Sequence, residues 1–211
     1  MSSSSKFKFK KVLPSALLAI VLCFSFFVNA DSDVPEKMKV FILVGNSALS
    51  GRDPERDTVK HPNAWKYVLY EDESTTDERF TWMPACEPLC NDGKNIGYRG
   101  GPGFPFLKEL IKLRPNQKFG IMQYSGSAWT IQKKMLRGEL PYDIIIQQAS
   151  VIKEKYEIVA LISMFGLVEV QKNYQDEYLD DVKQMVEQFR DDLDIPNLTY
   201  VHSEYPLLAG E

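Results

Sequence analysis

Three apolar runs of strand length and a last, more polar strand-like segment alternate with amphipathic segments of helix length along this chain. The apolar runs cover residues 38–45, 118–124 and 157–165, the last strand is expected over 198–205, and the helix-like segments cover 104–113, 142–156 and 174–193. Short apolar runs rich in branched residues indicate strands that are buried on both faces. Strands that alternate with helices predict parallel connections, so we expect an α/β fold in which helices cover both sides of a parallel sheet.

Two of the helix-like segments have a clear apolar face. In the segment 104–113 this face consists of Phe106, Leu107, Leu110 and Leu113, and in 174–193 of Leu179, Val182, Met185, Val186, Phe189 and Leu193. The other face of 174–193 is acidic and carries lysines, which is typical of a solvated helix surface. Between the first strand and the first of these helices, residues 51–100 are polar. We interpret them as a long connection, and connections of that length are often functional.

Residues 1–30 have the pattern of a secretory signal peptide. Lys6, Lys8, Lys10 and Lys11 precede an apolar run, and "VNA" stands before "DSD", which predicts cleavage after Ala30 and a single domain over 31–211. The protein would then be secreted or periplasmic. The alternative is a signal anchor, because the run is about long enough to cross a bilayer.

Removing this segment leaves 21 basic and 29 acidic residues, a net charge of −8. A surface of that sign disfavours nucleic acid and anionic membranes as partners.

Two cysteines, Cys86 and Cys90, follow the signal segment. An oxidising compartment favours a disulfide between them, and two unpaired thiols are the alternative. Two cysteines without a nearby histidine make a poor metal site, so we expect no metal. The sequon "NLT" at Asn197 would be glycosylated only in a eukaryotic secretory pathway.

Small-residue loops follow the predicted strands, where parallel sheets bind ligands. In "GNSALSGR", Ser47 is either a nucleophile, which needs a base and oxyanion donors, or an ordinary turn or helix-cap serine. In "YRGGPGFPF", Gly100, Gly101 and Gly103 precede a helix without the spacing of a phosphate loop. In "YSGSAW", Trp129 is either a sugar platform or a cover over the core.

These loops together resemble a known family. "KVFILVGNSALSGR" is similar to the "VFILAGQSNMAGRG" opening of carbohydrate esterase family 6, the sialate O-acetylesterase-like proteins of the SGNH (GDSL-like) hydrolases. "WMPACEPLCND" resembles the family's "W..A.EPLH.D", "GGPGFPFLKEL" its "GVGPG..FA..L", and "KFGIMQYSGSAW" its "..GLVPCAVGGTSI". The resemblance implies a flavodoxin-like three-layer α/β/α sandwich. It also implies a serine esterase that removes acetyl groups from carbohydrates without a cofactor.

The resemblance places Ser47 at the nucleophile position and Gly101 at the position of an oxyanion-hole glycine. It makes Asn46, Ser127 and Trp129 candidate substrate-binding residues. The chain departs from the family at several positions. Ala48 replaces an asparagine and Asn46 a glutamine, and "WYQGESD" falls on "SMFGLVE", so that Phe165 and Leu167 replace a glutamine and a glutamate. Phenylalanine cannot donate a hydrogen bond to an oxyanion.

The chain also departs from the family pattern at the catalytic base. The family's Asp-x-x-His motif has no counterpart before Glu211, and the histidine of "EPLH" is Cys90. His61 and His202 remain; His202 is a weak candidate base, with a structural histidine as the alternative. Three hypotheses therefore stand. They are an active exported acetylesterase, a catalytically impaired pseudoenzyme that binds carbohydrate or another partner, and a truncated gene product.

Overall fold

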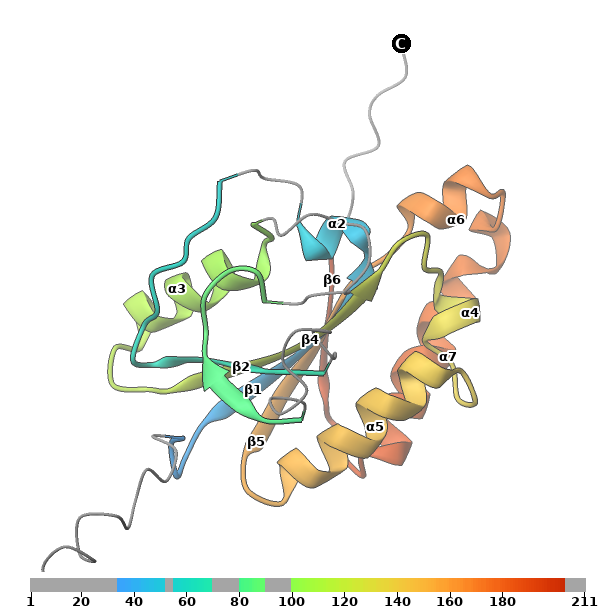
Figure 1. The fold of residues 1–211 in the computed structure, drawn as a ribbon. Coiled ribbons are helices and arrows are strands. Elements are labelled where there is room, and N and C mark those ends of the chain that lie inside the picture. Colours follow the sequence, from blue (N-terminus) through green and yellow to red (C-terminus); the bar gives the residue numbers. More distant parts are fainter. Residues whose placement is uncertain (1–33, 52–54, 70–79, 90–99, 204–211) are drawn as a thin grey trace, which may run out of the picture. The chain divides into compact units, whose positions relative to one another are not determined.

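The computed structural model describes residues 34–51, 55–69, 80–89 and 100–203. Its six strands are β1 (Lys39–Asn46), β2 (Ala64–Tyr67), β3 (Trp82–Pro84), β4 (Phe119–Gly126), β5 (Glu157–Met164) and β6 (Thr199–His202). They form one sheet in the order β3-β2-β4-β1-β5-β6 (Figure 1). Every neighbouring pair is parallel except β2 and β3, which are antiparallel.

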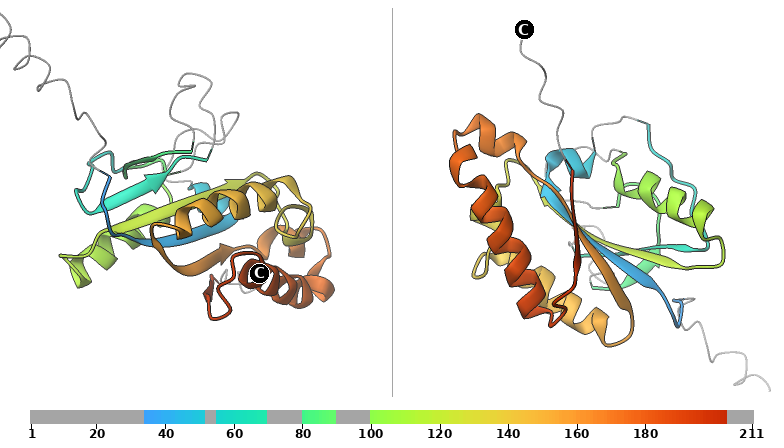
Figure 2. Two further views of the ribbon diagram at one scale, coloured as in Figure 1. Left: turned by 90° about the horizontal axis from the view of Figure 1, so that it is seen from below. Right: turned by 180° about the vertical axis from the view of Figure 1, so that it is seen from behind.

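The helices are α2 (Ser47–Ser50), α3 (Gly103–Leu113), α4 (Ile131–Lys134), α5 (Leu140–Lys153), α6 (Leu167–Gln171) and α7 (Gln175–Asp192). Helix α3 lies on one face of the sheet, and α5 and α7 lie on the other (Figures 1 and 2). This arrangement confirms the expected three-layer α/β/α sandwich. Within the described ranges, no helix is both long and apolar enough to span a bilayer.

Strand β1 is central because its side chains are apolar on both faces. Val40, Ile42 and Val44 are completely buried on one face, and Phe41 and Leu43 are buried on the other. The second pair belongs to the core beneath α3, whose buried side chains are Phe104, Leu107 and Ile111. Burial of both faces fixes β1 between β4 and β5 and so fixes where its last residue lies.

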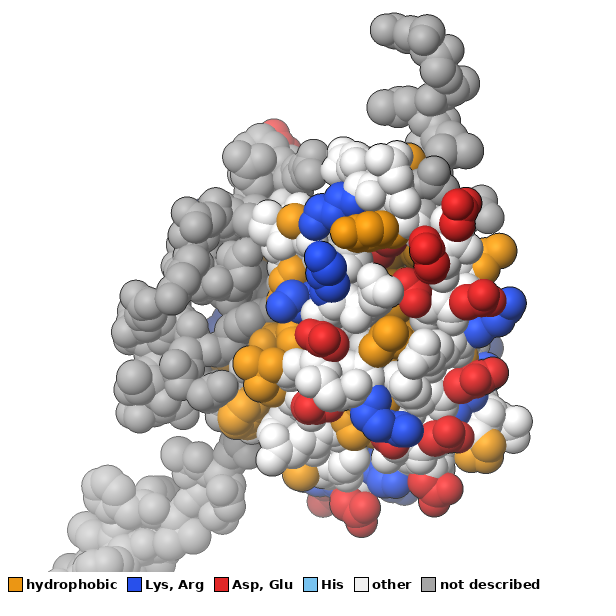
Figure 3. Space-filling view, turned by 90° about the vertical axis from the view of Figure 1, so that its right-hand side faces the viewer, with side chains coloured by type: hydrophobic (Ala, Val, Ile, Leu, Met, Phe, Trp, Pro, Cys, Tyr) orange, Lys and Arg blue, Asp and Glu red, His pale blue; other side chains and the backbone are white. Residues whose placement is uncertain are grey.

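The opposite layer joins α5 to α7. Tyr142 and Phe189 are almost completely buried and meet edge to face, with ring centroids 5.0 Å apart. The Tyr142 hydroxyl donates to Asp192 Oδ2 at 2.6 Å, and Arg137 holds the same carboxylate through two hydrogen bonds. The Arg137 guanidinium keeps the pKa of Asp192 below its ordinary value. The face formed by these helices carries acidic and basic side chains side by side (Figure 3).

Two parts of the sequence interpretation are corrected. The stretch 51–100 is not only a connection, because it contributes β2 and β3 to the edge of the sheet. The apolar faces also differ from those expected. Leu113 and Leu179 are 70% and 67% exposed, since the buried stripe of α3 runs through Phe104, Leu107 and Ile111, and that of α7 through Met185, Val186 and Phe189.

Several predictions fall outside the described residues. They are the signal peptide over 1–30 with its cleavage after Ala30, Cys90 as a disulfide partner, and the last two residues of the strand expected over 198–205. Asn197 of the sequon is described and lies exposed in the turn before β6.

Candidate active site

The carboxyl end of β1 is the point at which the strand order of the sheet reverses. Strands β2 and β4 lie to one side of β1, and β5 and β6 lie to the other. Open α/β sheets bind ligands in the crevice at such a switch point, because the loops of neighbouring strands diverge there. Ser47 is the first residue after β1, is half-buried, and begins α2 at this edge (Figure 1).

Asn46 caps the N-terminus of α2. Its side chain is 2% exposed, and its Oδ1 accepts a hydrogen bond from the Ala48 N–H at 3.0 Å. An asparagine in extended backbone at this position is a favoured helix cap, so the residue before Ser47 orients the turn that carries the hydroxyl. Contact between Asn46 and a substrate stays a prediction.

The short helix α2 is tied to its neighbours on both sides. The Ser50 and Ser125 hydroxyls are 2.8 Å apart, and Gln123 Nε2 donates to the Leu49 carbonyl at 3.2 Å. Helix α2 ends at Gly51, whose φ of 99° suits glycine, and a Cβ there would lie only 1.9 Å from the Gly100 carbonyl. The glycine loop, residues 100–102 before α3, therefore packs directly against the end of α2.

Gly101 lies in this loop, beside the backbone of Leu49–Gly51, and its N–H group already has an acceptor. It donates to Glu87 Oε1 at 3.2 Å. Glu87 is 7% exposed, and its Oε2 accepts the Asp57 N–H at 2.7 Å. The structure thus places Gly101 beside the backbone at the end of α2, with its N–H directed to a carboxylate.

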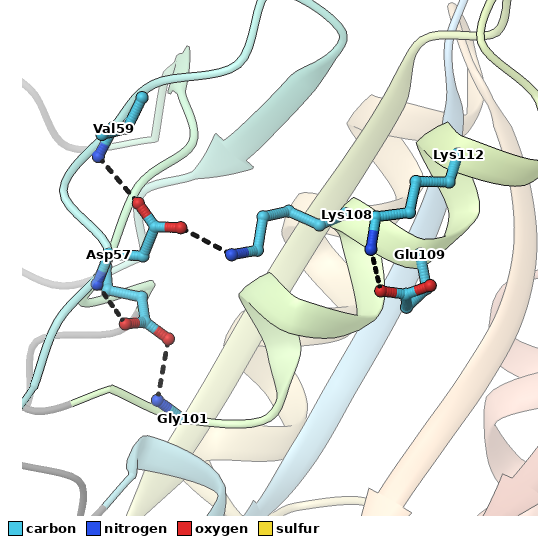
Figure 4. A network of polar contacts seen from close by, with 7 residues as sticks. Asp57, Val59, Gly101, Lys108, Glu109 and Lys112 are labelled. Atoms are coloured by element: carbon cyan, nitrogen blue, oxygen red, sulfur yellow. Dashed lines mark hydrogen bonds and ion pairs between the residues drawn. The ribbon is translucent and has the colours of Figure 1, made fainter.

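A pocket of about 570 Å³ opens to solvent beside Gly101. It is lined by Glu55, Arg56, Asp57, Glu87, Gly100, Gly101 and Pro105. Lys108 Nζ lies 2.5 Å from Asp57 Oδ2, and Asp57 Oδ1 accepts the Val59 N–H at 3.0 Å (Figure 4). The hydrogen bond from Lys108 lowers the pKa of Asp57. The pocket therefore has a polar wall that is fixed by hydrogen bonds.

The loop after β4 carries the other two candidate substrate-binding residues. Ser127 is exposed, and Trp129 is half-buried with its ring against the backbone of Gly126. The Trp129 ring also meets Tyr124 edge to face, with centroids 5.2 Å apart. Trp129 thus covers the end of β4 and keeps part of its ring at the surface, so the platform and cover interpretations both remain open.

His202 lies apart from Ser47. In the sheet register it pairs with Ser163, which in turn pairs with Val44, three residues before Ser47. Two strand spacings separate His202 from β1, about 10 Å. Its Nδ1 lies 2.9 Å from Ser163 Oγ, and its Nε2 lies 2.9 Å from the Tyr178 hydroxyl. The structure therefore places His202 in a hydroxyl cluster under α7 and does not bring it to Ser47.

His61, the other histidine of the chain, precedes β2 at the amino edge of the sheet. Its Nδ1 accepts the Asn63 N–H at 3.1 Å. Neither histidine is therefore placed beside Ser47. Within the described ranges, Ser47 Oγ has no hydrogen bond to another side chain, and no cluster of three or more metal-ligating residues occurs.

Phe165 and Leu167, just after β5, are apolar at positions where the resemblance puts a glutamine and a glutamate. Phe165 is 1% exposed. Two residues after Leu167, the buried carboxylate of Glu169 accepts the Gly166 N–H at 2.8 Å and the Ile131 N–H at 3.1 Å. Among the described residues, Glu169 and Glu87 are buried carboxylates that the sequence did not single out. The only sequence signal for either was that Glu87 lies in the "EPL" match to the family pattern.

The predicted disulfide stays a prediction. Cys86 is half-buried in the segment between β3 and the glycine loop, and Cys90 lies outside the described residues.

Comparison with solved structures shows the same fold in three proteins. A protein from Arabidopsis thaliana is 19% identical, over 78% of this chain and 72% of that one, with a TM-score of 0.64. NanS is 11% identical, over 82% and 69% of the two chains, with a TM-score of 0.66. A carbohydrate acetylesterase from Xanthomonas citri is 12% identical, over 77% and 40%, with a TM-score of 0.55.

Sequence comparison gives the family. No curated protein matches the chain. Residues 37–206 match the model of the family described as carbohydrate esterase, sialic acid-specific acetylesterase. The match includes β1, the turn with Ser47, the glycine loop and β6. The chain therefore belongs to the family of sialic acid-specific acetylesterases among the carbohydrate esterases.

Proposed function

We propose that this protein hydrolyses acetyl esters on carbohydrates slowly, with Ser47 as the nucleophile. The observation that carries the proposal is the position of Ser47. Its half-buried side chain stands at the switch point of the sheet, on a turn capped by Asn46, in a chain that belongs to an acetylesterase family. Neutral and weakly charged sugars suit the acidic surface better than strongly anionic ligands.

The reaction has two steps. Ser47 Oγ attacks the acetyl carbonyl carbon, and the C–O bond to the sugar breaks. The serine proton leaves on the sugar alcohol, and an acetyl-Ser47 ester remains. Water then attacks this ester and releases acetate, which restores the serine hydroxyl. Each step needs a base to take a proton from the attacking oxygen, and neither histidine lies beside Ser47.

Slow turnover follows from the surroundings of Ser47. Phe165 stands where the family has a hydrogen-bond donor, and the loss of one oxyanion donor costs roughly 10²–10³ in turnover. Since neither histidine of the described residues lies beside Ser47 to act as base, this domain should also be far slower than a complete serine esterase.

The test is acetate release from an acetylated monosaccharide by the purified protein and by Ser47→Ala. Ser150→Ala, on α5, is the matched control. We expect a low rate that falls to background in Ser47→Ala and stays unchanged in Ser150→Ala. Equal rates in all three folded proteins would show that Ser47 is not the nucleophile.

A second candidate function is carbohydrate binding without turnover. It is favoured by the Gly101 N–H, which donates to Glu87 instead of pointing an unused donor at Ser47. This candidate predicts that the protein and Ser47→Ala bind the acetylated sugar equally well in calorimetry and that neither releases acetate.

Export is part of the same proposal. The signal-like segment 1–30 would direct the domain to a secreted or periplasmic location. N-terminal sequencing of the protein recovered outside the cytoplasm should begin at Asp31. A first residue of Met1 on a membrane-bound product would instead indicate a signal anchor.

A further inference from the structure

We propose that Glu87 competes with the substrate for the Gly101 N–H and thereby restrains the esterase activity. The inference rests on the proposed function, in which Gly101 is an oxyanion donor. In the resting structure the carboxylate holds that donor, and an oxyanion on the acetyl group bound at Ser47 must displace it. Glu87 is therefore a residue that acts on the reaction through Gly101.

The contact is specific and half-buried. Glu87 is 7% exposed and accepts the Gly101 N–H through one oxygen, at 3.2 Å. Its other oxygen accepts the Asp57 N–H at 2.7 Å. Hydrogen bonds to an ionised acceptor are about twice as strong as those between neutral groups, so Gly101 has a strong partner before any substrate arrives.

The carboxylate is anchored from the other side. The Glu87 N–H donates to the Asp57 carbonyl at 2.9 Å, so Asp57 and Glu87 hold each other through two hydrogen bonds. The Asp57 side chain is in turn held by Lys108 on α3 (Figure 4). The glycine loop is equally confined, because a Cβ at Gly100 would lie 2.7 Å from Glu87 Oε2 and from the Glu55 carbonyl. The carboxylate and the loop thus keep their positions together.

The negative charge that develops during ester hydrolysis predicts that this contact lowers the rate. The transition state of ester hydrolysis places negative charge on the carbonyl oxygen, and a preorganised N–H stabilises that charge. A carboxylate at the same N–H removes the donor and adds repulsion between like charges. A residue with only a structural function would lower the rate when it is removed, whereas a competitor predicts a higher rate.

The first readout is kinetic. Glu87→Ala removes the acceptor. The serine-dependent kcat should rise by about 10- to 100-fold, which corresponds to the release of one hydrogen bond to a charged group. Glu87→Gln keeps the size of the side chain and one acceptor oxygen, so its serine-dependent kcat should rise less. Glu109→Gln removes a carboxylate that pairs with Lys112 on the exposed side of α3, and it should leave kcat unchanged. Each variant is also measured with Ser47→Ala, so that only serine-dependent turnover is compared.

The second readout does not need activity. The sequence contains one Gly-Gly pair, Gly100–Gly101. Labelling with carbonyl-¹³C glycine and ¹⁵N glycine therefore gives one correlated amide signal, that of Gly101. In Glu87→Ala this amide proton should move upfield and exchange faster with solvent, and in Glu109→Gln it should not change.

The outcomes separate the two proposals. A lower or unchanged kcat in Glu87→Ala, with serine-dependent turnover in the natural protein, would overturn the competition and leave the proposed function standing. An unchanged Gly101 amide would also overturn the competition. If no protein, Glu87→Ala included, shows serine-dependent turnover, the proposed function fails and the restraint by Glu87 fails with it.

Discussion

The buried carboxylate of Glu169 should contribute strongly to stability. It is 2% exposed and accepts two backbone N–H groups, from Gly166 at 2.8 Å and from Ile131 at 3.1 Å. These groups begin α6 and α4, so a single side chain fixes the starts of two helices at the carboxyl edge of the sheet. Glu169→Ala leaves the buried Ile131 N–H and the half-buried Gly166 N–H without this acceptor.

The cost follows from those two groups. A buried donor left without an acceptor costs about 1–3 kcal/mol, so the loss of both hydrogen bonds should cost about 2–6 kcal/mol. In a domain of this size each kcal/mol lowers Tm by about 2–4 °C, so Glu169→Ala should unfold at least ~4 °C below the natural protein.

Thermal and urea unfolding followed by circular dichroism measure this cost. Glu169→Gln, which keeps one acceptor oxygen, should fall between Glu169→Ala and the natural protein. Glu187→Ala, an exposed glutamate on α7, should change Tm little. A loss of less than about 1 kcal/mol in Glu169→Ala would refute the reasoning, because it would mean that both N–H groups find other partners.

Three further predictions follow from packing and charge. Phe189→Ala, at a completely buried ring against Tyr142, should cost about 3–5 kcal/mol in urea unfolding, and Leu179→Ala, at a 67% exposed side chain, should be near neutral. Burial and the charges of Glu177, Glu169 and Asp180 raise the pKa of Asp181 above 3.8. The folded state then holds that proton more tightly, so stability falls as pH rises through the raised pKa, and Asp181→Asn should raise Tm at pH 7 but not at about pH 3. Gly126→Ala must displace the Trp129 ring, since the new Cβ would lie 2.2 Å from it, and the tryptophan emission should shift to longer wavelength; unchanged emission would contradict this contact.

The long elements could be predicted from the sequence because apolar pattern alone determines them. The runs at 38–45, 118–124 and 157–165 are each within two residues of β1, β4 and β5. Strands β2 and β3 could not be predicted, because they are only four and three residues long and lie in a polar stretch without an apolar run. The exposure of Leu179 was also missed, since helical spacing identifies a stripe but not where the neighbouring layer ends.

The candidate site was predictable only in part, for a related reason. Local motifs single out Ser47 and Gly101, and the structure places Ser47 at the carboxyl end of β1 and Gly101 beside the end of α2; their functions stay predictions. The contacts of Glu87 and Glu169 could not be found, because each carboxylate accepts N–H groups from segments distant in sequence. His202 shows that residue type alone does not identify a catalytic base. A histidine near the end of a strand suggests a base, but its partners here are Ser163 and Tyr178.

The most direct test of the account is to look for the acetyl group on Ser47 itself. An activated acetyl ester has a good leaving group, so it can acylate a serine with little help from a base, whereas release of the acetyl group by water still needs one. Rapid acid quenching followed by peptide mass spectrometry should therefore find acetyl-Ser47 accumulating in the natural protein, with no acetylated peptide 47–51 in Ser47→Ala. An unmodified Ser47 while acetate is being released, or the same acetylation at another residue in both proteins, would contradict the claim that Ser47 is the nucleophile.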